Sequence, residues 1–184
     1  MEDCERENIF LGKSSSHSEM YPSHFYEPHN GVQPGMKPPP SLPAGSFPEP
    51  DGACVVHIVV SGYPAPARPL PRERTWALCW SPANGVVRIL STVRTAPEKD
   101  SYVYWGPITQ AHEFPRECRL VPVASLGRGK RSALERIANG VGVMRPNGWW
   151  NGQNWVVEVL KRAVEHDLIS PEERDNAIYT AAEP

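Results

Sequence analysis

The chain has 184 residues, a formal net charge of −2 and a pI near 6.3, which suits one domain with a tail. No basic patch is large enough to follow a phosphate backbone, so nucleic acid is not expected as a partner. No apolar run approaches the length of a membrane span, and no apolar segment follows the acidic start MEDCEREN. We therefore expect no signal peptide and a cytoplasmic or nuclear protein with free thiols.

Residues 1–52 differ in composition from the rest of the chain. Prolines recur through them with serine and glycine between, and such a segment cannot bury enough apolar surface to offset the cost of ordering. We predict a disordered tail here and a single domain at 53–184. The stretch MKPPPSLPAG, 36–45, is typical of a polyproline II segment. It would be an inert tail or a docking peptide for a partner protein.

The domain begins with a predicted run of five strands. CVVHIVVSGY is a continuous β-branched run, and RTWALCWSP alternates Trp76, Leu78 and Trp80 on one face. Asn84-Gly85 is a hairpin signal. The short connections favour antiparallel pairing. The five predicted strands are 54–63, 74–82, 85–93, 101–108 and 116–126.

Helices follow the strands. The segments 130–140 and 153–168 carry apolar residues at helical spacing. Ser170-Pro171 with Glu173 combines an N-cap, a proline at the first helical position and a capping box. Strands followed by two or three helices predict an α+β domain. The basic stretch Arg128, Lys130 and Arg131 is expected to lie in solvent at a helix start.

Thiol catalysis requires a cysteine with a histidine within hydrogen-bond reach. His57 lies in the middle of the first predicted strand and Cys79 in the second, while Cys54 opens the first. An active cysteine hydrolase or acyltransferase would use His57 as base and Cys79 or Cys54 as nucleophile. The alternative is that His57 and Cys79 are packed residues of the sheet. No histidine or cysteine pair has metal-ligand spacing, so neither a metal nor a cofactor is predicted.

The stretch PNGWWNGQNWVVEVL, 146–160, places Trp149, Trp150 and Trp155 around the start of a helix. Asn151 can cap that helix. The tryptophans either close the core where the loop meets the sheet or form an aromatic-walled cleft for a small ligand.

These residues resemble a known family. An Asn-Cys-Gln triplet at a helix start marks papain-like thiol enzymes, and the lecithin:retinol acyltransferase and cell-wall amidase group is the nearest comparison. Here Asn151-Gly152-Gln153 stands in the Asn-Cys-Gln place, and Thr75-Trp76 stands where that group has a His-Trp pair. The chain is also similar to fungal proteins with an Asn-Cys-Gln-x-Trp helix, a pattern that Trp155 completes.

The resemblance implies a papain-like arrangement over about residues 54–170. Gly152 replaces the nucleophile and Thr75 replaces the base, and neither residue type can perform those roles. We therefore expect a fungal-type protein with a non-catalytic papain-like domain. It would bind a small ligand or a protein partner, or serve as an accessory protein of a biosynthetic pathway. The pocket candidates are Thr75, Trp76, Trp149, Trp150, Asn151, Gly152, Gln153 and Trp155. An interaction module that recruits a partner through its tail is a further alternative.

Overall fold

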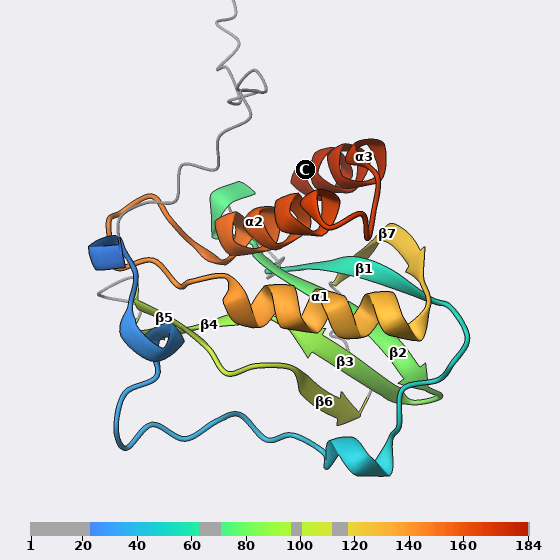
Figure 1. Cartoon of the computed structure of the whole chain (residues 1–184). Helices are drawn as coiled ribbons and strands as arrows, with labels where there is room; N and C mark the ends of the chain where they lie inside the picture. The colour runs from blue at the N-terminus through green and yellow to red at the C-terminus, as the bar shows by residue number, and fades with distance from the viewer. Residues whose placement is uncertain (1–22, 63–70, 97–100, 112–117, 184) are drawn as a thin grey trace, which may run out of the picture.

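A computed structural model of the chain describes residues 23–62, 71–96, 101–111 and 118–183. Five antiparallel strands form one sheet in the order β6-β3-β2-β1-β7, and β4 and β5 form a separate two-stranded ribbon (Figure 1). The α+β class and the five-stranded antiparallel sheet are confirmed. The strands are β1 Cys54–Ser61, β2 Thr75–Ala83, β3 Val86–Leu90, β4 Thr92–Ala96, β5 Ser101–Tyr104, β6 Ile108–Ala111 and β7 Arg119–Leu126. The helices are α1 Arg128–Gly140, α2 Gly152–Glu165 and α3 Pro171–Ala182.

Two of the predicted strands are each divided in two. The predicted strand 85–93 becomes β3 and β4, and 101–108 becomes β5 and the start of β6. The breaks lie opposite each other, since Ile89 pairs with Ile108 and Thr92 with Tyr104. Gly106 adopts a φ of +88° and is followed by a proline, which has no N–H for a ladder. The β3–β6 pair and the β4–β5 pair are therefore two halves of one long antiparallel hairpin. The hairpin bends at these breaks, so that its far half leaves the large sheet as the β4–β5 ribbon.

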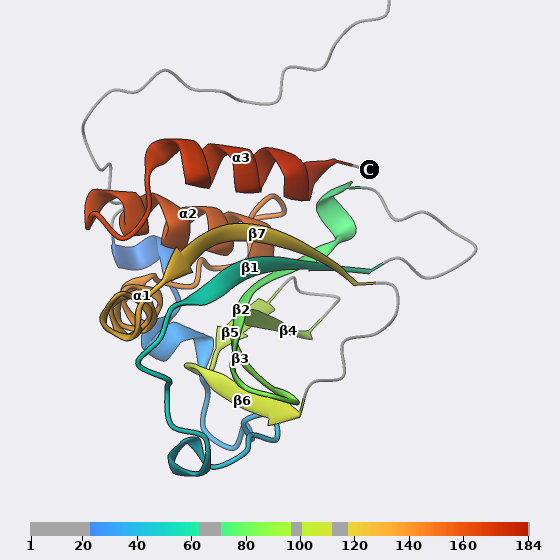
Figure 2. The same cartoon turned by 90° about the vertical axis from the view of Figure 1, so that its right-hand side faces the viewer.

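The three helices lie over one face of the large sheet (Figure 2). α2 packs on β2, and α3 packs on β7. The predicted alternation in the second strand is confirmed, because Trp76, Leu78 and Trp80 are all buried in the shared core. α2 contributes its own apolar stripe to that core, and burial of such side chains is the main favourable term in folding. The stripe consists of Trp155, Val156, Val159, Leu160 and Ala163.

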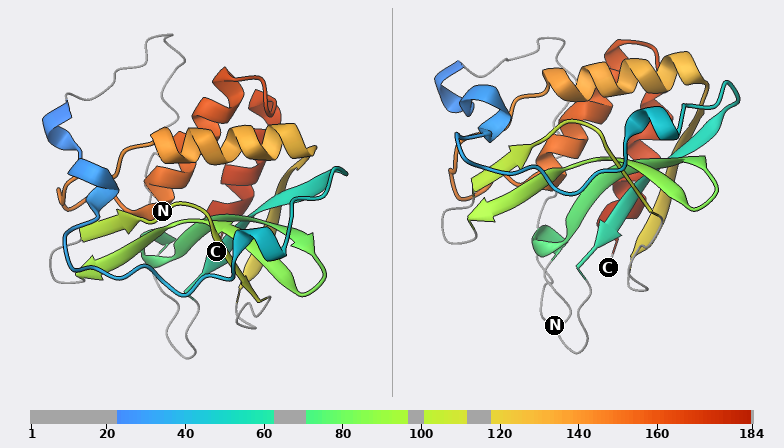
Figure 3. Two further views of the ribbon diagram at one scale, coloured as in Figure 1. Left: turned by 60° about the horizontal axis from the view of Figure 1, so that its bottom comes forward. Right: turned by 90° about the horizontal axis from the view of Figure 1, so that it is seen from below.

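The segment before β1 differs from the predicted disordered tail. Residues 1–22 lie outside the described residues, but 23–52 pack along the domain, passing β5 and then β6 (Figure 3). The amide of Glu27 donates to the carbonyl of Val143 at 2.7 Å, and the amide of Leu42 donates to the carbonyl of Thr109 in β6 at 2.7 Å. Backbone groups of the edge strand thereby gain partners, and a covered edge cannot pair with another chain. Composition did not reveal these contacts because each is made with a distant part of the sequence.

Gly31 shows how closely this segment approaches the ribbon. It has a φ of +81°, and a Cβ atom there would collide with the carbonyl oxygen of Tyr102 in β5. A glycine is therefore required both by backbone conformation and by space.

The basic stretch at the start of α1 also differs from expectation. Arg131 is fully buried, and its guanidinium donates to Glu49 at 2.7 Å and to the carbonyl of Leu126 at 2.6 Å. Glu49 also accepts from the indole N–H of Trp80 at 2.9 Å. A carboxylate and backbone carbonyls, most of them from the N-terminal segment, offset the cost of burying this charge, and helix periodicity alone could not predict them. Arg128 does lie largely in solvent, paired with Asp51.

Three cysteines, Cys54, Cys79 and Cys118, have free thiols, and the fourth lies outside the described residues. Within the described ranges, none of the helices combines the length and the apolar character that a membrane crossing requires.

Candidate functional site

The turn before α2 is held by two asparagine side chains. The Oδ1 of Asn147 accepts from the amides of Trp149 at 3.1 Å and Trp150 at 2.9 Å. The Oδ1 of Asn151 then caps the amides of Gln153 at 2.9 Å and Asn154 at 3.4 Å. The expected cap is therefore present, and it begins the helix at Gly152.

Gly152 is buried against the ribbon. A Cβ atom at this position would lie 2.9 Å from the hydroxyl oxygen of Thr92 in β4 and 4.0 Å from the carbonyl oxygen of Trp76. The first distance is shorter than real Cβ contacts, so any larger residue here requires Thr92 to move. The space that a side chain at position 152 would need is thus occupied by the Thr92 hydroxyl.

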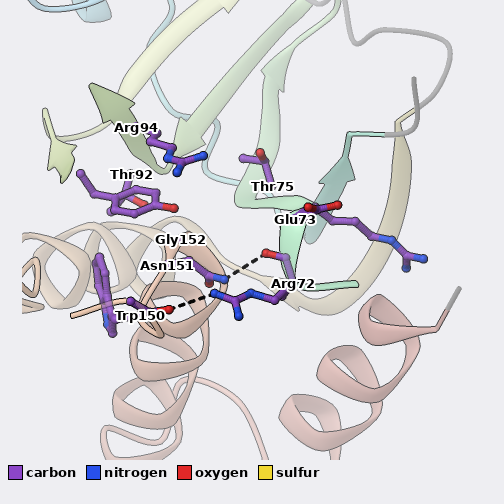
Figure 4. Close-up of a pocket in the computed structure, with 11 residues that line it drawn as sticks. Arg72, Glu73, Thr75, Thr92, Arg94, Trp150, Asn151 and Gly152 are labelled. Carbon is purple, nitrogen blue, oxygen red and sulfur yellow. Dashed lines mark hydrogen bonds between the residues drawn. The ribbon is translucent and has the colours of Figure 1, made fainter. Parts of the chain in front are cut away.

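A cavity of about 530 Å³ opens in front of this contact (Figure 4). Its volume lies within the usual range for small-molecule sites. The walls come from four parts of the chain: the segment entering β2, the strand β4, the strand β5 and the turn into α2. The lining residues are Arg72, Glu73, Arg74, Thr75, Thr92, Arg94, Tyr102, Gly148, Trp150, Asn151 and Gly152.

Hydrogen bonds join the segment before β2 to the start of α2. The Nδ2 of Asn151 donates to the carbonyl of Arg72 at 3.1 Å, and the guanidinium of Arg72 donates to the carbonyl of Gly148 at 3.0 Å (Figure 4). The Nε2 of Gln153 donates to the carbonyl of Arg74 at 2.7 Å. Because these bonds cross between the two segments, they fix the separation of two walls of the cavity.

The cavity lining carries an excess of positive charge and includes two aromatic rings. Three arginines, at 72, 74 and 94, line it against a single carboxylate, Glu73. The rings of Tyr102 and Trp150 meet edge to face with centroids 5.6 Å apart, and Tyr102 is paired with Arg94 across the β4–β5 ribbon. A cavity of this kind can hold a small molecule with an apolar or planar body and a polar group.

The structure divides the predicted pocket residues into two sets. Thr75, Trp150, Asn151 and Gly152 line the cavity. The other four do not: Trp76 and Trp155 are buried in the core, Gln153 bonds to a backbone carbonyl, and Trp149 is 52% exposed. The sequence predicted that the tryptophans either close the core or line a cleft. Trp155 lies in the core, whereas Trp150 lines the cavity.

Sequence reasoning missed the residues that the bent ribbon and the β2 entry segment supply. Thr92, Arg94 and Tyr102 reach the cavity only because β4 and β5 leave the large sheet. The arginine-rich stretch RERT, 72–75, was a usable signal, since it adjoins the Thr75-Trp76 pair on which the resemblance rests.

The alternative pair, His57 and Cys79, occupies neighbouring positions on β1 and β2. The two residues are directly paired in the sheet and line a second cavity of about 310 Å³, together with Cys54. Burial raises the pKa of Cys79 to about 12 and lowers the pKa of His57. No hydrogen bond joins the two side chains. Burial thus favours a neutral thiol beside a neutral imidazole, which is the reverse of an activated thiolate.

Among the described residues, no group of three or more His, Cys, Asp or Glu side chains is arranged to hold a metal ion. Comparison of the chain with protein-family models, with curated proteins and with solved structures gave no match.

Proposed function

We propose that this protein is a non-catalytic binding domain whose ligand is a small molecule held between the start of α2 and the β4–β5 ribbon. The observation that carries the proposal is the cavity itself, which has the volume of a ligand site and brings together four distant parts of the chain. Its walls are fixed in advance by side chain–backbone hydrogen bonds, so little ordering cost remains to be met on binding.

The resemblance to papain-like thiol enzymes supports the absence of catalysis within this proposal. Thr75 and Gly152, which stand in the places of base and nucleophile, line the same cavity. Neither can act in thiol chemistry, and no cysteine is among the lining residues. A papain-like domain that has lost its reactive pair and kept its cleft is consistent with these positions.

The first test is for turnover. The full chain is incubated with an aryl thioester and a p-nitroanilide, beside the Asn151→Ala variant. We expect no release above the buffer rate from either protein. Turnover by the wild-type chain that disappears in Asn151→Ala would contradict the proposal, because it would place a working catalyst at the α2 start.

The second test is for binding. The ¹⁵N-labelled full chain is titrated with small aromatic molecules that are neutral, anionic or cationic. We expect at least one of these to shift the amide signals of Gly148, Trp150 and Gly152, while the signals of α3 stay in place. If none of the aromatic molecules shifts any of these three amide signals, the proposal is overturned.

A further inference from the structure

We infer that the ligand of this cavity is a small anion, a carboxylate or a phosphate monoester carried on an apolar or aromatic body. This inference rests on the proposed binding function and adds the chemical class of the ligand. It follows from three observations that are independent of one another: the arginines, the buried hydroxyl of Thr92 and the first amide of α2.

The first observation is the charge of the walls. Arg72 and Arg94 approach the cavity from different elements, the segment before β2 and the strand β4 (Figure 4). Arg74 also lines it, and Glu73 is the one carboxylate among the described lining residues, so the lining carries an excess of positive charge. Two of these guanidinium groups already donate to backbone carbonyls, Arg72 to Gly148 at 3.0 Å and Arg74 to Glu183. Guanidinium groups present several N–H donors in a plane, which suits the oxygens of a carboxylate or phosphate. A cationic ligand would meet this surface with repulsion.

The second observation is an unsatisfied hydroxyl. Thr92 is 4% exposed, and among the described residues its Oγ1 has no hydrogen-bond partner. A buried polar atom without a partner is costly and uncommon. Thr92 lines the cavity, and its Oγ1 lies beside Gly152, where there is no Cβ atom. An anion seated there would accept a hydrogen bond from the Thr92 hydroxyl and remove the deficit.

The third observation is the start of α2. Asn151 caps the amides of Gln153 and Asn154, but the N–H of Gly152, the first helical residue, takes no part in that cap. The first amides of a helix have no acceptor within the helix, and its N-terminal end favours negative charge. Gly152 lines the cavity and lies against Thr92, so a ligand at this wall would lie near the first amide of α2.

The apolar side of the cavity accounts for the rest of the ligand. The Tyr102 and Trp150 rings form a wall of the same cavity that the arginines line. A planar body against these rings would place its anionic group toward Arg94, Thr92 and the start of α2. Benzoate and phenyl phosphate are the simplest molecules that combine both parts.

The test compares four probes on the full chain by NMR titration: benzoate, phenyl phosphate, benzamide and benzylamine. Benzamide has the shape of benzoate without its charge. We expect benzoate or phenyl phosphate to bind at least about tenfold more tightly than benzamide, and benzylamine to bind most weakly. The better of the two anions identifies carboxylate or phosphate as the preferred group. Added salt should weaken the anions and leave benzamide unchanged.

Variants locate the effect. Arg94→Gln should weaken the preferred anion by about tenfold and leave benzamide binding unchanged. Thr92→Val keeps the side-chain shape without the hydroxyl. We expect it to lower the affinity for the anion by several fold and to leave the affinity for benzamide unchanged. Arg128→Gln removes an equal charge at the start of α1, away from the cavity, and should have no effect.

Two results would overturn the inference while leaving the proposed binding function in place. One is benzamide binding as tightly as both anions, which would leave the proposed binding function standing without an anion preference. The other is an equal loss of anion affinity in Arg94→Gln and Arg128→Gln, which would show that the anion preference comes from the net charge of the protein and not from the cavity. If no probe shifts the cavity signals, the inference and the proposed function fail together.

Discussion

The hydroxyl oxygen of Thr92 lies 2.9 Å from the point that a Cβ atom at Gly152 would occupy. Thr92 comes from the ribbon and Gly152 from the first turn of α2, so this contact sets how closely the two elements approach. Both residues line the cavity. The absence of a side chain at 152 is therefore a packing requirement.

Gly152→Ala is predicted to destabilise the fold. Alanine favours a helix by about 1 kcal/mol over glycine, but overpacking costs about 1–3 kcal/mol, and the short Thr92 side chain has little freedom to move aside. We expect a net loss of about 1 kcal/mol in the free energy of unfolding, measured by urea denaturation. Adding Thr92→Ala should relieve most of that loss, because the two atoms in conflict are then no longer both present.

The control for this substitution is Gly129→Ala. Gly129 also lies in the first turn of a helix, but nothing stands within 4 Å of its Cβ position. This variant should be as stable as the wild type or slightly more so. Equal stability of Gly152→Ala and the wild type, with no coupling to Thr92, would refute the close contact.

Arg131→Met is predicted to be strongly destabilising. The substitution leaves Glu49 without its guanidinium partner. It also removes the hydrogen bonds from Arg131 to the backbone carbonyls of Gly52 and Leu126. Breaking a buried ion pair of this kind costs about 3–5 kcal/mol. Arg128→Met, which breaks the exposed pair with Asp51, should cost less than about 1 kcal/mol. Similar losses in the two variants, by chemical denaturation, would show that the N-terminal segment is not anchored at Arg131.

The lowered pKa of His57 predicts a loss of stability in mild acid. In the unfolded chain the imidazole takes up its proton near its usual pKa of 6.5, whereas burial delays protonation in the fold. The unfolded state therefore binds more protons as the pH falls below about 6.5, and stability declines until the folded pKa is passed. His57→Gln should flatten this part of the melting temperature–pH profile. His24→Gln, which removes an exposed histidine, should keep the wild-type profile, and an unchanged slope in His57→Gln would contradict the assignment.

Cys79 is predicted to be inert toward thiol reagents in the folded protein. Burial raises its pKa to about 12, so almost no thiolate is present at about pH 8. Alkylation by iodoacetamide, followed by peptide mass spectrometry, should label Cys79 only after unfolding in denaturant. Folded-state labelling of Cys79 with a midpoint near neutral pH would instead support the alternative enzyme that uses His57 and Cys79.

The sequence predicted the local elements better than the cavity. The alternation of Trp76, Leu78 and Trp80 and the Ser170 capping box are local patterns, and both features are present in the structure. Thr92 falls within the predicted strand 85–93 and Arg94 directly follows that strand. Their place in the cavity depends on a bend between the β3–β6 pair and the β4–β5 pair, which the sequence did not reveal. The burial of Arg131 likewise depends on Glu49, which is 82 residues away in sequence.

The resemblance pairs Thr75 with Gly152, and both residues line the cavity although they are far apart in the chain. The papain-like resemblance itself stays a prediction. Composition and periodicity could not have brought these two positions together, because neither measures contact between distant segments.

The most direct test of the account is the location of a bound anion on the full chain. Intermolecular nuclear Overhauser effects between phenyl phosphate or benzoate and the protein report which side chains touch the probe ring. We predict contacts to the ring protons of Trp150 and Tyr102, together with a shift of the Gly152 amide. Contacts confined to Leu120 and Val87 of the second cavity, or the absence of any contact at saturating probe, would contradict the account.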